Sequence, residues 1–564
     1  MKAIFEKYLP PGLAVRLSQL ESQTAVARAT LGDELRHELA ACAAYIPSRL
    51  VHSHLAHPQP GRISGHLWHG SLVFADLSGF TEFCEKLSVL GKQGAEEVSG
   101  VVNRLFNALV ADVLAYHGEL LKFGGDALTA FFDAETLGLD HASAATLAAL
   151  AMQASMAGFA ALETRAGTFR LRLRVGVHSG QVFAAEVGSS HHIELVVTGA
   201  DVNLVARAQK YAAPGEVIIS SQTADLLREA TLTARHDGFY QVTALPDITC
   251  SPPPRPFSTT VSNGTEDLES LALRVAALRP YLVYRLPRRY LGDSAAEIGE
   301  FRPVSVLFAN FCDFSSLLTR FGEDMDLAAA ALNAYFRRIQ AAVHHYGGIV
   351  NKVDMYIHGD KLMALFGAPS ANENDPLRAV SCAFDLDTAL EEANTEIAAL
   401  IPPAPAALPS EAIPRLKQRI GINTGTVFAG RVGGGRRYEY TVMGPAVNLS
   451  FRLMEAASEG VILLSPATRA EVSRFVAVID QTPIAIKGVA DPIVPAHALK
   501  EHGGPISLGP TSLPQVPLIG RDAEFSRLLK NAREALQGIG RVLAIVGEAG
   551  TGKTRLTEEL VRTW

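Results

Sequence analysis

Residues 118–132 have the sequence GELLKFGGDALTAFF, and this stretch decides the fold that we expect. Two leucines lead into a Phe-Gly-Gly-Asp turn and an apolar run leaves it, which is the pattern of a β-hairpin with one carboxylate, Asp126, at its tip. A second carboxylate, Asp76, follows a buried-type strand at 71–75 in LVFADLSGF. Two carboxylates beside glycines suit a site for magnesium and a nucleotide. The alternative is that both are solvated turn residues.

Length and composition set the broad class. The 564 residues predict several domains, and an apolar content of 48% is ample for their cores. A net charge of −7 gives no reason to expect nucleic acid as a partner. The five cysteines have no metal-type spacing, which favours a reduced, cytoplasmic protein, and the N-terminus lacks the pattern of a signal peptide. Residues 141–162 lack charges but are mostly alanine, so they predict a buried helix rather than a membrane span.

The most informative property of the whole chain is an internal repeat. The matched segments, in order, are 45–51 with 285–291, 71–83 with 305–317, 103–122 with 333–352, 174–188 with 419–433, and 196–209 with 441–454. Five matches in the same order predict two copies of one domain, at 46–245 and 286–499. The second copy has extra residues, which we assign to a Pro/Ala-rich loop at 402–414 and a longer hairpin tip.

Within the first copy, strand and helix patterns alternate. The expected elements are a strand at 71–75, a helix at 80–117, the hairpin at 119–132, a helix at 140–164, strands at 170–177 and 182–187, a helix at 201–211 and a strand at 216–220. This order predicts an α/β or α+β domain with a mixed sheet. A helical arm at 1–45 precedes the repeat, and linkers are expected at 246–285, where the chain should be flexible and exposed, and at 500–516.

The C-terminal segment carries a different motif. RVLAIVGEAGTGKTRL at 541–556 has the pattern of an apolar strand, a phosphate-binding loop and the start of a helix. The loop's marker residues are Gly547, Gly552, Lys553 and Thr554. We therefore expect 517–564 to be the beginning of a P-loop NTPase domain, truncated before it can form a competent site.

Four motifs together give a family resemblance. FADLSGF, KFGGD, EYTVMGPAVNLSFR and the C-terminal GEAGTGKT resemble the class III nucleotidyl cyclases, and the nearest type is the soluble, bicarbonate-responsive adenylyl cyclase. The resemblance implies two ferredoxin-like cyclase domains that pair head-to-tail as an intramolecular pseudo-dimer. Such a chain would be a monomer without a membrane span. It would convert Mg-ATP to 3′,5′-cyclic AMP and pyrophosphate at the interface of the two domains.

In this resemblance the first copy is the metal-binding half. Asp76 and Asp126 would hold two Mg²⁺ ions, with Mn²⁺ as the alternative metal. The backbone at Leu77, Gly79 and Phe80 would hold phosphate oxygens. Asn310 stands in the second copy where the first has Asp76, and an amide is a poorer ligand for Mg²⁺.

The resemblance makes the second copy the half that binds the base and the transition state. Lys352 and Thr441 match the adenine-binding lysine and threonine of the family. Asn448 and Arg452 match its ribose-positioning and transition-state residues, and Lys487 matches a phosphate-binding lysine. Val196 replaces the threonine in the first copy, so one complete and one degenerate site are expected.

The degenerate half departs from the family at its anion site. Lys122 matches the lysine that binds bicarbonate, but Ala206 stands where the arginine is expected. The first copy keeps Asn203 and Arg207, which resemble Asn448 and Arg452. We therefore expect Lys122 and Arg207 to form a regulatory site for bicarbonate, another anion or a nucleotide, with activation by bicarbonate itself in doubt.

Two alternatives to an adenylyl cyclase remain open. The pair of domains could be a catalytically inactive scaffold that senses nucleotide and regulates the attached NTPase module. It could also be a guanylyl cyclase, although that activity would be expected to replace Lys352 and Thr441 with glutamate and a small residue such as cysteine. Each matched side chain also has a purely structural alternative as a strand-end, helix-surface or turn residue.

Overall fold

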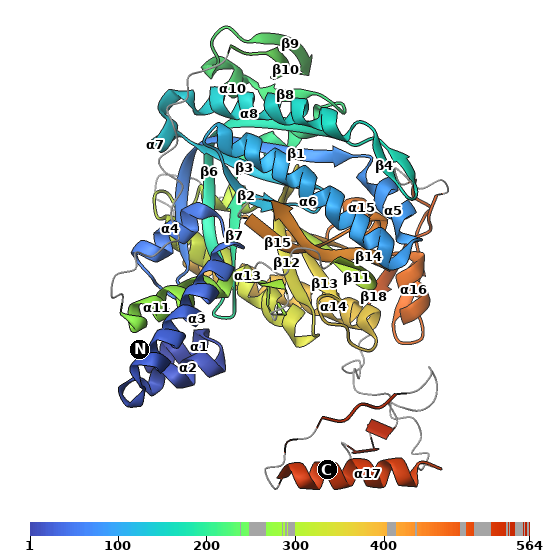
Figure 1. The fold of residues 1–564 in the computed structure, drawn as a ribbon. Helices are drawn as coiled ribbons and strands as arrows, with labels where there is room; N and C mark the ends of the chain where they lie inside the picture. The colour runs from blue at the N-terminus through green and yellow to red at the C-terminus, as the bar shows by residue number, and fades with distance from the viewer. Residues whose placement is uncertain are drawn as a thin grey trace. The chain divides into compact units, whose positions relative to one another are not determined.

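The fold is given by a computed structural model of the chain (Figure 1). The structure describes residues 1–236, 238–246, 267–284, 286–287, 290–291, 299–402, 413–434, 437–485, 492–500, 520–536, 540, 542–546, 556–557, 559–560 and 563. These residues fall into two compact units, Met1–Gly503 and Gly504–Trp564. Both copies predicted from the repeat lie in the first unit.

The first copy is an α+β domain built on a mixed sheet of eight strands. The strands are β1 (Ser64–Ser78), β2 (Glu119–Phe123), β3 (Ala127–Asp133), β6 (Arg172–Ser189), β7 (His192–Thr198), β8 (Val217–Ser220), β9 (Thr231–His236) and β10 (Phe239–Ala244). They follow the order β2-β3-β1-β6-β8-β10-β9, with β7 also paired to β6. Only β6 and β8 pair in parallel; the other pairs are antiparallel. The order β2-β3-β1-β6 is the expected ferredoxin-like arrangement.

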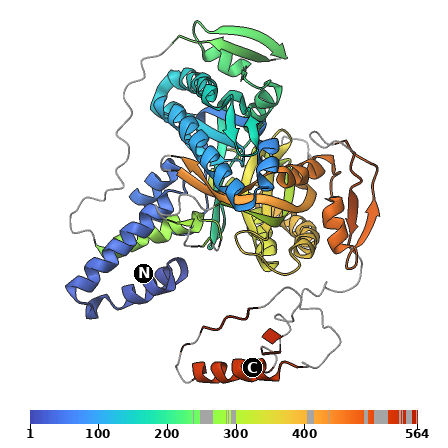
Figure 2. The same ribbon diagram turned by 45° about the vertical axis from the view of Figure 1, so that its right-hand side comes forward.

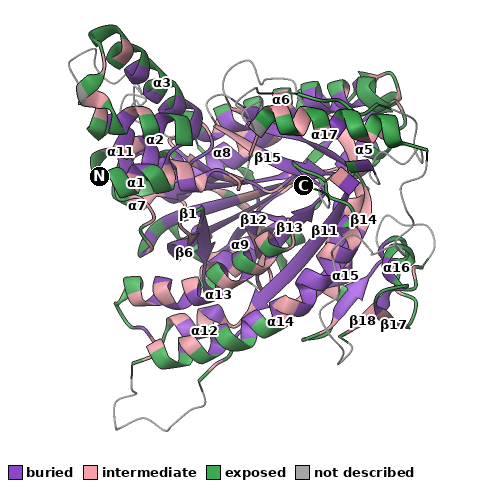
Figure 3. Ribbon diagram, turned by 90° about the horizontal axis from the view of Figure 1, so that it is seen from below, coloured by how far each residue is buried: buried purple, intermediate pink, exposed green. Residues whose placement is uncertain are grey.

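Helices cover this sheet and connect its strands. They are α4 (Ser48–Ala56), α5 (Phe80–Ser88), α6 (Gly91–Ala115), α7 (Ala134–Leu137), α8 (His141–Ser155), α9 (Ala200–Tyr211) and α10 (Ser221–Leu226), and a small hairpin, β4 (Leu162–Thr164) and β5 (Gly167–Phe169), follows α8. Figure 3 shows the strands largely buried and the exposed positions mostly on the outer faces of helices. The amphipathic helices therefore bury one stripe against the sheet, as their apolar spacing predicts.

The second copy repeats this topology strand for strand. Its strands are β11 (Gly299–Cys312), β12 (Ile349–Tyr356), β13 (Gly359–Phe366), β14 (Lys417–Gly434), β15 (Arg437–Met443), β16 (Ile462–Leu464), β17 (Ala477–Asp480) and β18 (Ala496–Leu499), in the order β12-β13-β11-β14-β16-β18-β17 with β15 on β14. Its helices are α12 (Phe314–Leu318), α13 (Met325–His345), α14 (Asp375–Leu400), α15 (Pro445–Ala456) and α16 (Pro466–Val472). The predicted duplication of one mixed-sheet domain is confirmed.

The two copies pack against each other as well as being joined in sequence. Helix α6 lies against β14, and α13 lies against β6 (Figures 1 and 2). The core under the first sheet includes Phe428, Val432 and Met443 of the second copy. A shared core makes the pair a single folding unit rather than two domains that touch at their surfaces.

The extra residues of the second copy have two sources in the structure. The hairpin tip is longer, because Lys122 precedes Asp126 by four residues whereas Lys352 precedes its counterpart Asp360 by eight. Helix α14 has 26 residues where α8 has 15. Most of the Pro/Ala-rich loop at 402–414 lies outside the described residues.

Three predicted elements are corrected. The helix at 80–117 is two helices, α5 and α6, because the chain turns at residues 89–90. The strands at 170–177 and 182–187 are one continuous strand, β6. The linker at 246–285 is not wholly flexible or exposed, because residues 268–278 form helix α11 (Leu268–Leu278), whose Leu271 and Val275 are fully buried.

The N-terminal arm is helical as predicted, with α1 (Lys2–Tyr8) and α2 (Pro11–Ser18) separated at Pro10. Helix α3 (Ala25–Ala43) packs against α11, and both contribute to one apolar cluster with the first sheet. The carbonyl oxygen of Ala44, at the end of α3, accepts a hydrogen bond of 2.7 Å from the N–H of Tyr438 in β15. The arm thus joins the first copy, the linker helix and the second copy.

Among the residues that the structure describes, two helical stretches are long and apolar enough to pass a simple test for membrane spans, Gly91–Ala115 and Ala134–Phe159. About half of each apolar window is buried inside the fold (50% and 56%), and core helices of soluble domains pass the same test. They are weak evidence for a membrane. Residues 141–155 form a buried helix, as predicted for the uncharged segment. The predicted end of the helix at 164 is wrong, because residues 162–164 are strand β4.

The second unit contains helix α17 (Asp522–Leu536), as its sequence predicts. The strand predicted at 541–546 is absent from the described residues 542–546, and Val542 and Val546 are almost fully exposed there. Gly547, Gly552, Lys553 and Thr554 of the predicted phosphate loop lie outside the described residues. The P-loop module therefore stays a prediction.

Candidate active site

The sheet of the first copy brings its two predicted metal ligands together. Asp76 lies near the end of β1, and its partner in β3 is Ala127, the residue directly after Asp126. The N–H of Leu77 donates to the carbonyl oxygen of Asp126 at 3.0 Å. The two carboxylates therefore lie side by side where β1 meets the hairpin turn. The same bond corrects the expectation for Leu77, because its N–H is used in the sheet and is not presented to phosphate.

The electrostatics of the pair show how close the two carboxylates are. Burial and the neighbouring charge of Asp76 together raise the pKa of Asp126 to about 7. Burial also raises the pKa of Asp76, against the opposing influence of Arg174. Two carboxylates held together in a partly buried place create a negative potential that a divalent cation would relieve.

Asp76 has two partners that the sequence did not single out. Arg174 in β6 forms an ion pair with Asp76 Oδ2, and the side-chain N–H of Gln209 in α9 donates to the same oxygen at 3.2 Å. The position of Arg174 could have been found, because both copies begin the matched segments RVGVHSG and RIGINTG with an arginine. These contacts hold the Asp76 carboxylate in a fixed orientation.

The second copy places cations against these carboxylates. Lys352 in β12 is 5% exposed, and its Nζ donates to the carbonyl oxygen of Phe123 in β2 at 3.3 Å. Gly125 has φ of +82°, which favours glycine at this turn, and a Cβ added there would be in ordinary contact with Lys352 Nζ at 3.8 Å, so the lysine lies beside the turn. Lys352 lowers the pKa of Asp126, which places the lysine within electrostatic reach of the metal-binding pair.

A further cation, Lys361, was not predicted. Its positive charge lowers the pKa values of both Asp76 and Asp126. Its Nζ lies 4.7 Å from the ring centre of Phe451 in α15. The sequence carried a signal for it, because Ala127 occupies the matching position of the first copy. The second copy therefore adds a positive charge where the first has none.

Helix α15 carries the two residues expected to act on the ribose and the reacting phosphate. Asn448 Nδ2 donates to Thr81 Oγ1 of the first copy at 2.7 Å. Arg452 lies within electrostatic reach of Asp76 and forms an ion pair with Glu455 on its own helix. The side chain of Arg452 is 40% exposed, so it can turn toward a ligand at modest cost.

The loop before α5 has the backbone shape expected for phosphate binding. Gly79 precedes the first helical residue, Phe80, with φ of +91°, and a Cβ there would lie 2.6 Å from the carbonyl oxygen of Arg170. Only glycine fits this position. The N-terminus of a helix favours anions, because its first N–H groups are unpaired and carry partial positive charge.

The residues predicted for the active site itself lie close together, with two exceptions. Asp76, Asp126, Lys352, Asn448 and Arg452 converge where the first copy's β1 and hairpin meet β12 and α15 of the second. Thr441 in β15 lies beside Lys352's neighbour Asn351. The exceptions are Leu77, for the reason given above, and Lys487, which lies outside the described residues.

The donors fit a magnesium site, although the fold itself supplies few of them. Among the described residues no cluster of three or more His, Cys, Asp or Glu side chains could hold a metal. Mg²⁺ commonly takes only one or two protein carboxylates and fills its shell with water and substrate phosphates. Asp76 and Asp126 meet that requirement.

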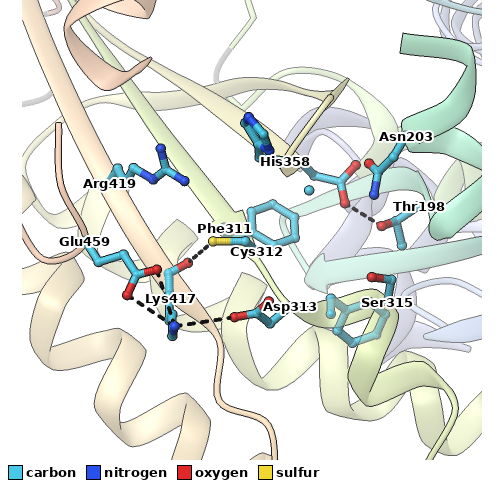
Figure 4. Close-up of a pocket in the computed structure, with 13 residues that line it drawn as sticks. Thr198, Asn203, Phe311, Cys312, Asp313, Ser315, His358, Lys417, Arg419 and Glu459 are labelled. Atoms are coloured by element: carbon cyan, nitrogen blue, oxygen red, sulfur yellow. Dashed lines mark hydrogen bonds and ion pairs between the residues drawn. The ribbon is translucent and has the colours of Figure 1, made fainter. Parts of the chain in front are cut away.

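The pseudo-symmetric second junction forms a cavity of about 300 Å³ (Figure 4). Its lining includes Thr198 and Asn203 of the first copy and Asp313, Asp360 and Arg419 of the second. Thr198 Oγ1 donates to the buried carboxylate of Asp360, which is the counterpart of Asp126. This contact joins the two copies across the degenerate site.

Two side chains make this second site unlike the first. Asn310, the counterpart of Asp76, turns its Nδ2 into the hairpin and donates to the carbonyl oxygens of His358 (3.1 Å) and Asp360 (2.8 Å). Asp313 stands at the position of Gly79, with φ of +73°. The Asp313 carboxylate places a negative charge there and lies 4.0 Å from Lys417 Nζ, so this junction presents a different pattern of charge to a phosphate group than the first does.

The expected anion pair, Lys122 and Arg207, is not assembled in this cavity. Lys122 Nζ donates to the carbonyl oxygen of Val353 at 2.8 Å and lies 3.9 Å from a carboxylate oxygen of Glu194. Arg207 is exposed on α9. Neither is among the described residues that line the cavity, so a regulatory anion site at this pair stays a prediction.

The burial of the Asp360 carboxyl group leads us to expect a measurable pH dependence of the protein's stability. Burial raises its pKa to about 7 from an ordinary 3.8. The folded state therefore holds this proton more tightly than the unfolded chain. Stability is lost as the pH rises from about 4 to 7, and the full cost, roughly 3–5 kcal/mol, is present above pH 7.

Replacing Asp360 by asparagine should remove that cost, since the amide oxygen can still accept from Thr198. We expect Asp360→Asn to raise the melting temperature at pH 8 and to match the wild type near pH 4. Thermal unfolding followed by circular dichroism at both pH values measures this. An equal shift at both pH values would contradict the assignment.

The comparison with known proteins agrees with this geometry. The pattern of the family described as "Adenylate and Guanylate cyclase catalytic domain" matches residues 69–250 and 296–496. The two matches cover most of the chain and coincide with the two copies. The chain belongs to this family and carries its catalytic domain twice.

Particular relatives resemble nearly the whole chain. It is 25% identical over 558 residues to human adenylate cyclase type 10, covering 91% of this chain and 32% of the relative, and 25% identical over 561 residues to the mouse protein of the same name. The chain thus spans about a third of the length of these relatives. In fold, it is similar to a class III adenylyl cyclase-like ATP-binding protein from Pseudomonas aeruginosa, with a TM-score of 0.50, 14% identity, and coverage of 77% of this chain and 93% of that one.

Proposed function

We propose that this chain is an adenylyl cyclase that converts Mg-ATP to 3′,5′-cyclic AMP and pyrophosphate at the junction of Asp76 and Asp126 with the second copy. The main support is that junction itself. Two carboxylates of one copy meet Lys352, Asn448 and Arg452 of the other copy around one place. The other junction keeps counterparts of several of these residues, but Asn310 replaces Asp76 there and Val196 replaces Thr441. Only this junction carries the complete set, which an inactive scaffold would not need.

Asp76 and Asp126 are the residues that would hold the metal ions. Bound Mg²⁺, or Mn²⁺ in its place, would acidify the ribose 3′-hydroxyl and neutralise charge on the triphosphate. The helix start at Gly79 and Phe80 would receive phosphate oxygens through backbone N–H groups. Arg174, released from Asp76, would be left facing the same phosphates, because its guanidinium lies against the metal-binding carboxylate.

Asn448 and Arg452 would act on the reacting groups. An amide that holds the ribose in attack geometry contributes mainly by lowering the entropy cost of the ring closure. Arg452 would meet the negative charge that grows on the α-phosphoryl group during the displacement. Both lie on one face of α15, four residues apart, so one helix would position both groups.

Lys352 and Thr441 would select the base. A lysine ammonium donates to N1 of adenine, and a hydroxyl oxygen accepts from the 6-amino group. Guanine has a donor at N1 and an acceptor at position 6, so it would leave buried polar groups unpaired. The proposed substrate is therefore ATP rather than GTP.

The test is a product assay with the purified chain, Mg²⁺ and either ATP or GTP. We expect 3′,5′-cyclic AMP and an equal amount of pyrophosphate, identified by mass spectrometry and a coupled phosphate assay, with kcat/KM for ATP at least about a hundredfold above that for GTP. Metal-dependent cyclic GMP as the main product would favour a guanylyl cyclase. No cyclic nucleotide from either substrate would favour the scaffold.

A further inference from the structure

The residue before Lys352 occupies an irregular position in the sheet. Val350 faces Ala364 and Lys352 faces Met363, so Asn351 is an extra residue between two paired positions. Such a bulge breaks the alternation of a strand and re-aims the side chains next to it. Asn351 is 6% exposed, which makes it a buried polar group whose hydrogen bonds have to be made inside the protein.

The hydrogen bonds of Asn351 fix the orientation of its amide. Its Nδ2 donates to the carbonyl oxygen of Tyr440 at 2.8 Å. A carbonyl oxygen can only accept, so the NH₂ end of the amide must face Tyr440 and Oδ1 must face the other way. Oδ1 accepts from Thr441 Oγ1 at 3.1 Å.

This arrangement decides what Thr441 can offer a ligand. A threonine hydroxyl has one proton, and here Asn351 takes it. Thr441 is 1% exposed, so bulk water has little access to that proton. The free lone pairs of Oγ1 then make Thr441 an obligate acceptor, which matches a 6-amino group and opposes a 6-oxo group.

We propose that Asn351 is a positioning residue that sets the preference for adenine over guanine by directing the hydroxyl proton of Thr441 away from the base. The inference rests on the proposed function, because it assumes that Lys352 and Thr441 meet the base. Asn351 does not touch the nucleotide itself.

The first copy provides an internal comparison. It has the same bulge, between Leu120 and Lys122, but the bulged residue is Leu121. The counterpart of Thr441 is Val196, so both members of the pair are apolar and buried in the copy that does not bind the base. The fold therefore tolerates an apolar pair, and the polar pair of the second copy is not required to build the bulge.

The test uses these natural replacements in the full chain. Asn351→Leu leaves the Thr441 hydroxyl free to turn and donate to a 6-oxo group. We expect the ratio of kcat/KM for ATP to that for GTP to fall about 10- to 100-fold. Asn351→Asp, neutral in this buried place, keeps an acceptor for Thr441 and an O–H donor for the Tyr440 carbonyl oxygen, so it should hold the ratio within about threefold of the wild type. A merely structural role would make both variants lose activity on both nucleotides equally.

A double-mutant cycle isolates the coupling. In a Thr441→Val background there is no hydroxyl proton to direct, so adding Asn351→Leu should change the ATP-to-GTP ratio less than about threefold. Thermal melting checks that each variant is folded. A ratio unchanged by Asn351→Leu in the wild-type background, or lowered equally in both backgrounds, would overturn the inference.

Binding measurements separate this result from the proposed function. Calorimetric titration with non-hydrolysable ATP and GTP analogues gives the same ratio without turnover. A chain that prefers the ATP analogue but makes no cyclic AMP would overturn the proposed function alone, and the effect of Asn351→Leu on that preference would still decide the role of Asn351. A wild-type chain that binds neither analogue would overturn both.

Discussion

Replacing Asp126 by asparagine should abolish the formation of cyclic AMP, with a loss of kcat of about a thousandfold or more. The amide removes the charge that, with Asp76, would hold the metal ions, and metal stabilisation of a transferring phosphoryl group is worth several kcal/mol. The measurement is steady-state cyclic AMP production over a range of Mg²⁺ and Mn²⁺ concentrations. Higher metal concentrations should not restore the rate.

The same change should not harm the fold. Because burial raises the pKa of Asp126 to about 7, its carboxylate is ionised at a cost in stability, and the neutral amide has no such cost. The melting temperature of the metal-free variant should therefore be no lower than that of the wild type at pH 8. Asp360→Asn is the matched control, since Asp360 occupies the same place in the degenerate junction. If both variants lost activity equally, the two junctions would not be functionally unequal.

Replacing Arg452 by alanine should lower kcat by about 100- to 1,000-fold and change KM for ATP by less than about threefold. An arginine that interacts with negative charge developing on the α-phosphoryl group stabilises the transition state and contributes little to the binding of the substrate. Arg452→Lys should recover only part of the rate, because an ammonium cannot make the paired hydrogen bonds of a guanidinium. Initial rates at saturating and limiting ATP measure this split.

The chain contains its own control for this prediction. Arg207 occupies the corresponding position of α9 in the first copy and is exposed there. Arg207→Ala should lower kcat far less than Arg452→Ala. A large rise in KM with an unchanged kcat in Arg452→Ala would instead assign the arginine to substrate binding.

The duplicated fold could be predicted because the repeat is carried by whole segments rather than by single residues. The boundaries of individual strands were predicted less accurately where the local composition resembles that of a turn. The predicted break between the strands 170–177 and 182–187 contains a glycine, Gly180. Gly180 is nevertheless in the sheet, and a Cβ there would lie 2.1 Å from Asp201 Oδ2 at the start of α9. The glycine reflects a close helix contact, which no local pattern reveals.

From the sequence, only the site residues at the ends of neighbouring strands could be predicted to lie together. Asp76 and Asp126 are marked by the turns that follow or precede them, and their proximity follows from pairing neighbouring strands. Arg174 meets Asp76 through a pairing between residues 98 positions apart. Lys361 reaches the carboxylates only because the two copies pack together. Contacts of this kind depend on register and domain packing, which the sequence pattern does not specify.

Helix α11 shows a different limit. Its sequence, LESLALRVAAL, has apolar residues at helical spacing, but it lies inside a segment whose Pro-rich and polar neighbours predict a linker. The helix is stable because α3 covers its apolar face. Burial against another helix thus stabilises a helix in a segment whose local composition predicts a linker.

Carrying both copies on one polypeptide has a consequence for how such a site would assemble. In a cyclase built from separate identical subunits, the site forms only when two chains associate, so activity declines on dilution. Here the shared core and the N-terminal arm keep the halves at a fixed, high effective concentration. Tethering also allows the halves to diverge, because each junction is always made from the same two partners, and mutation can specialise one while the other takes on a different task.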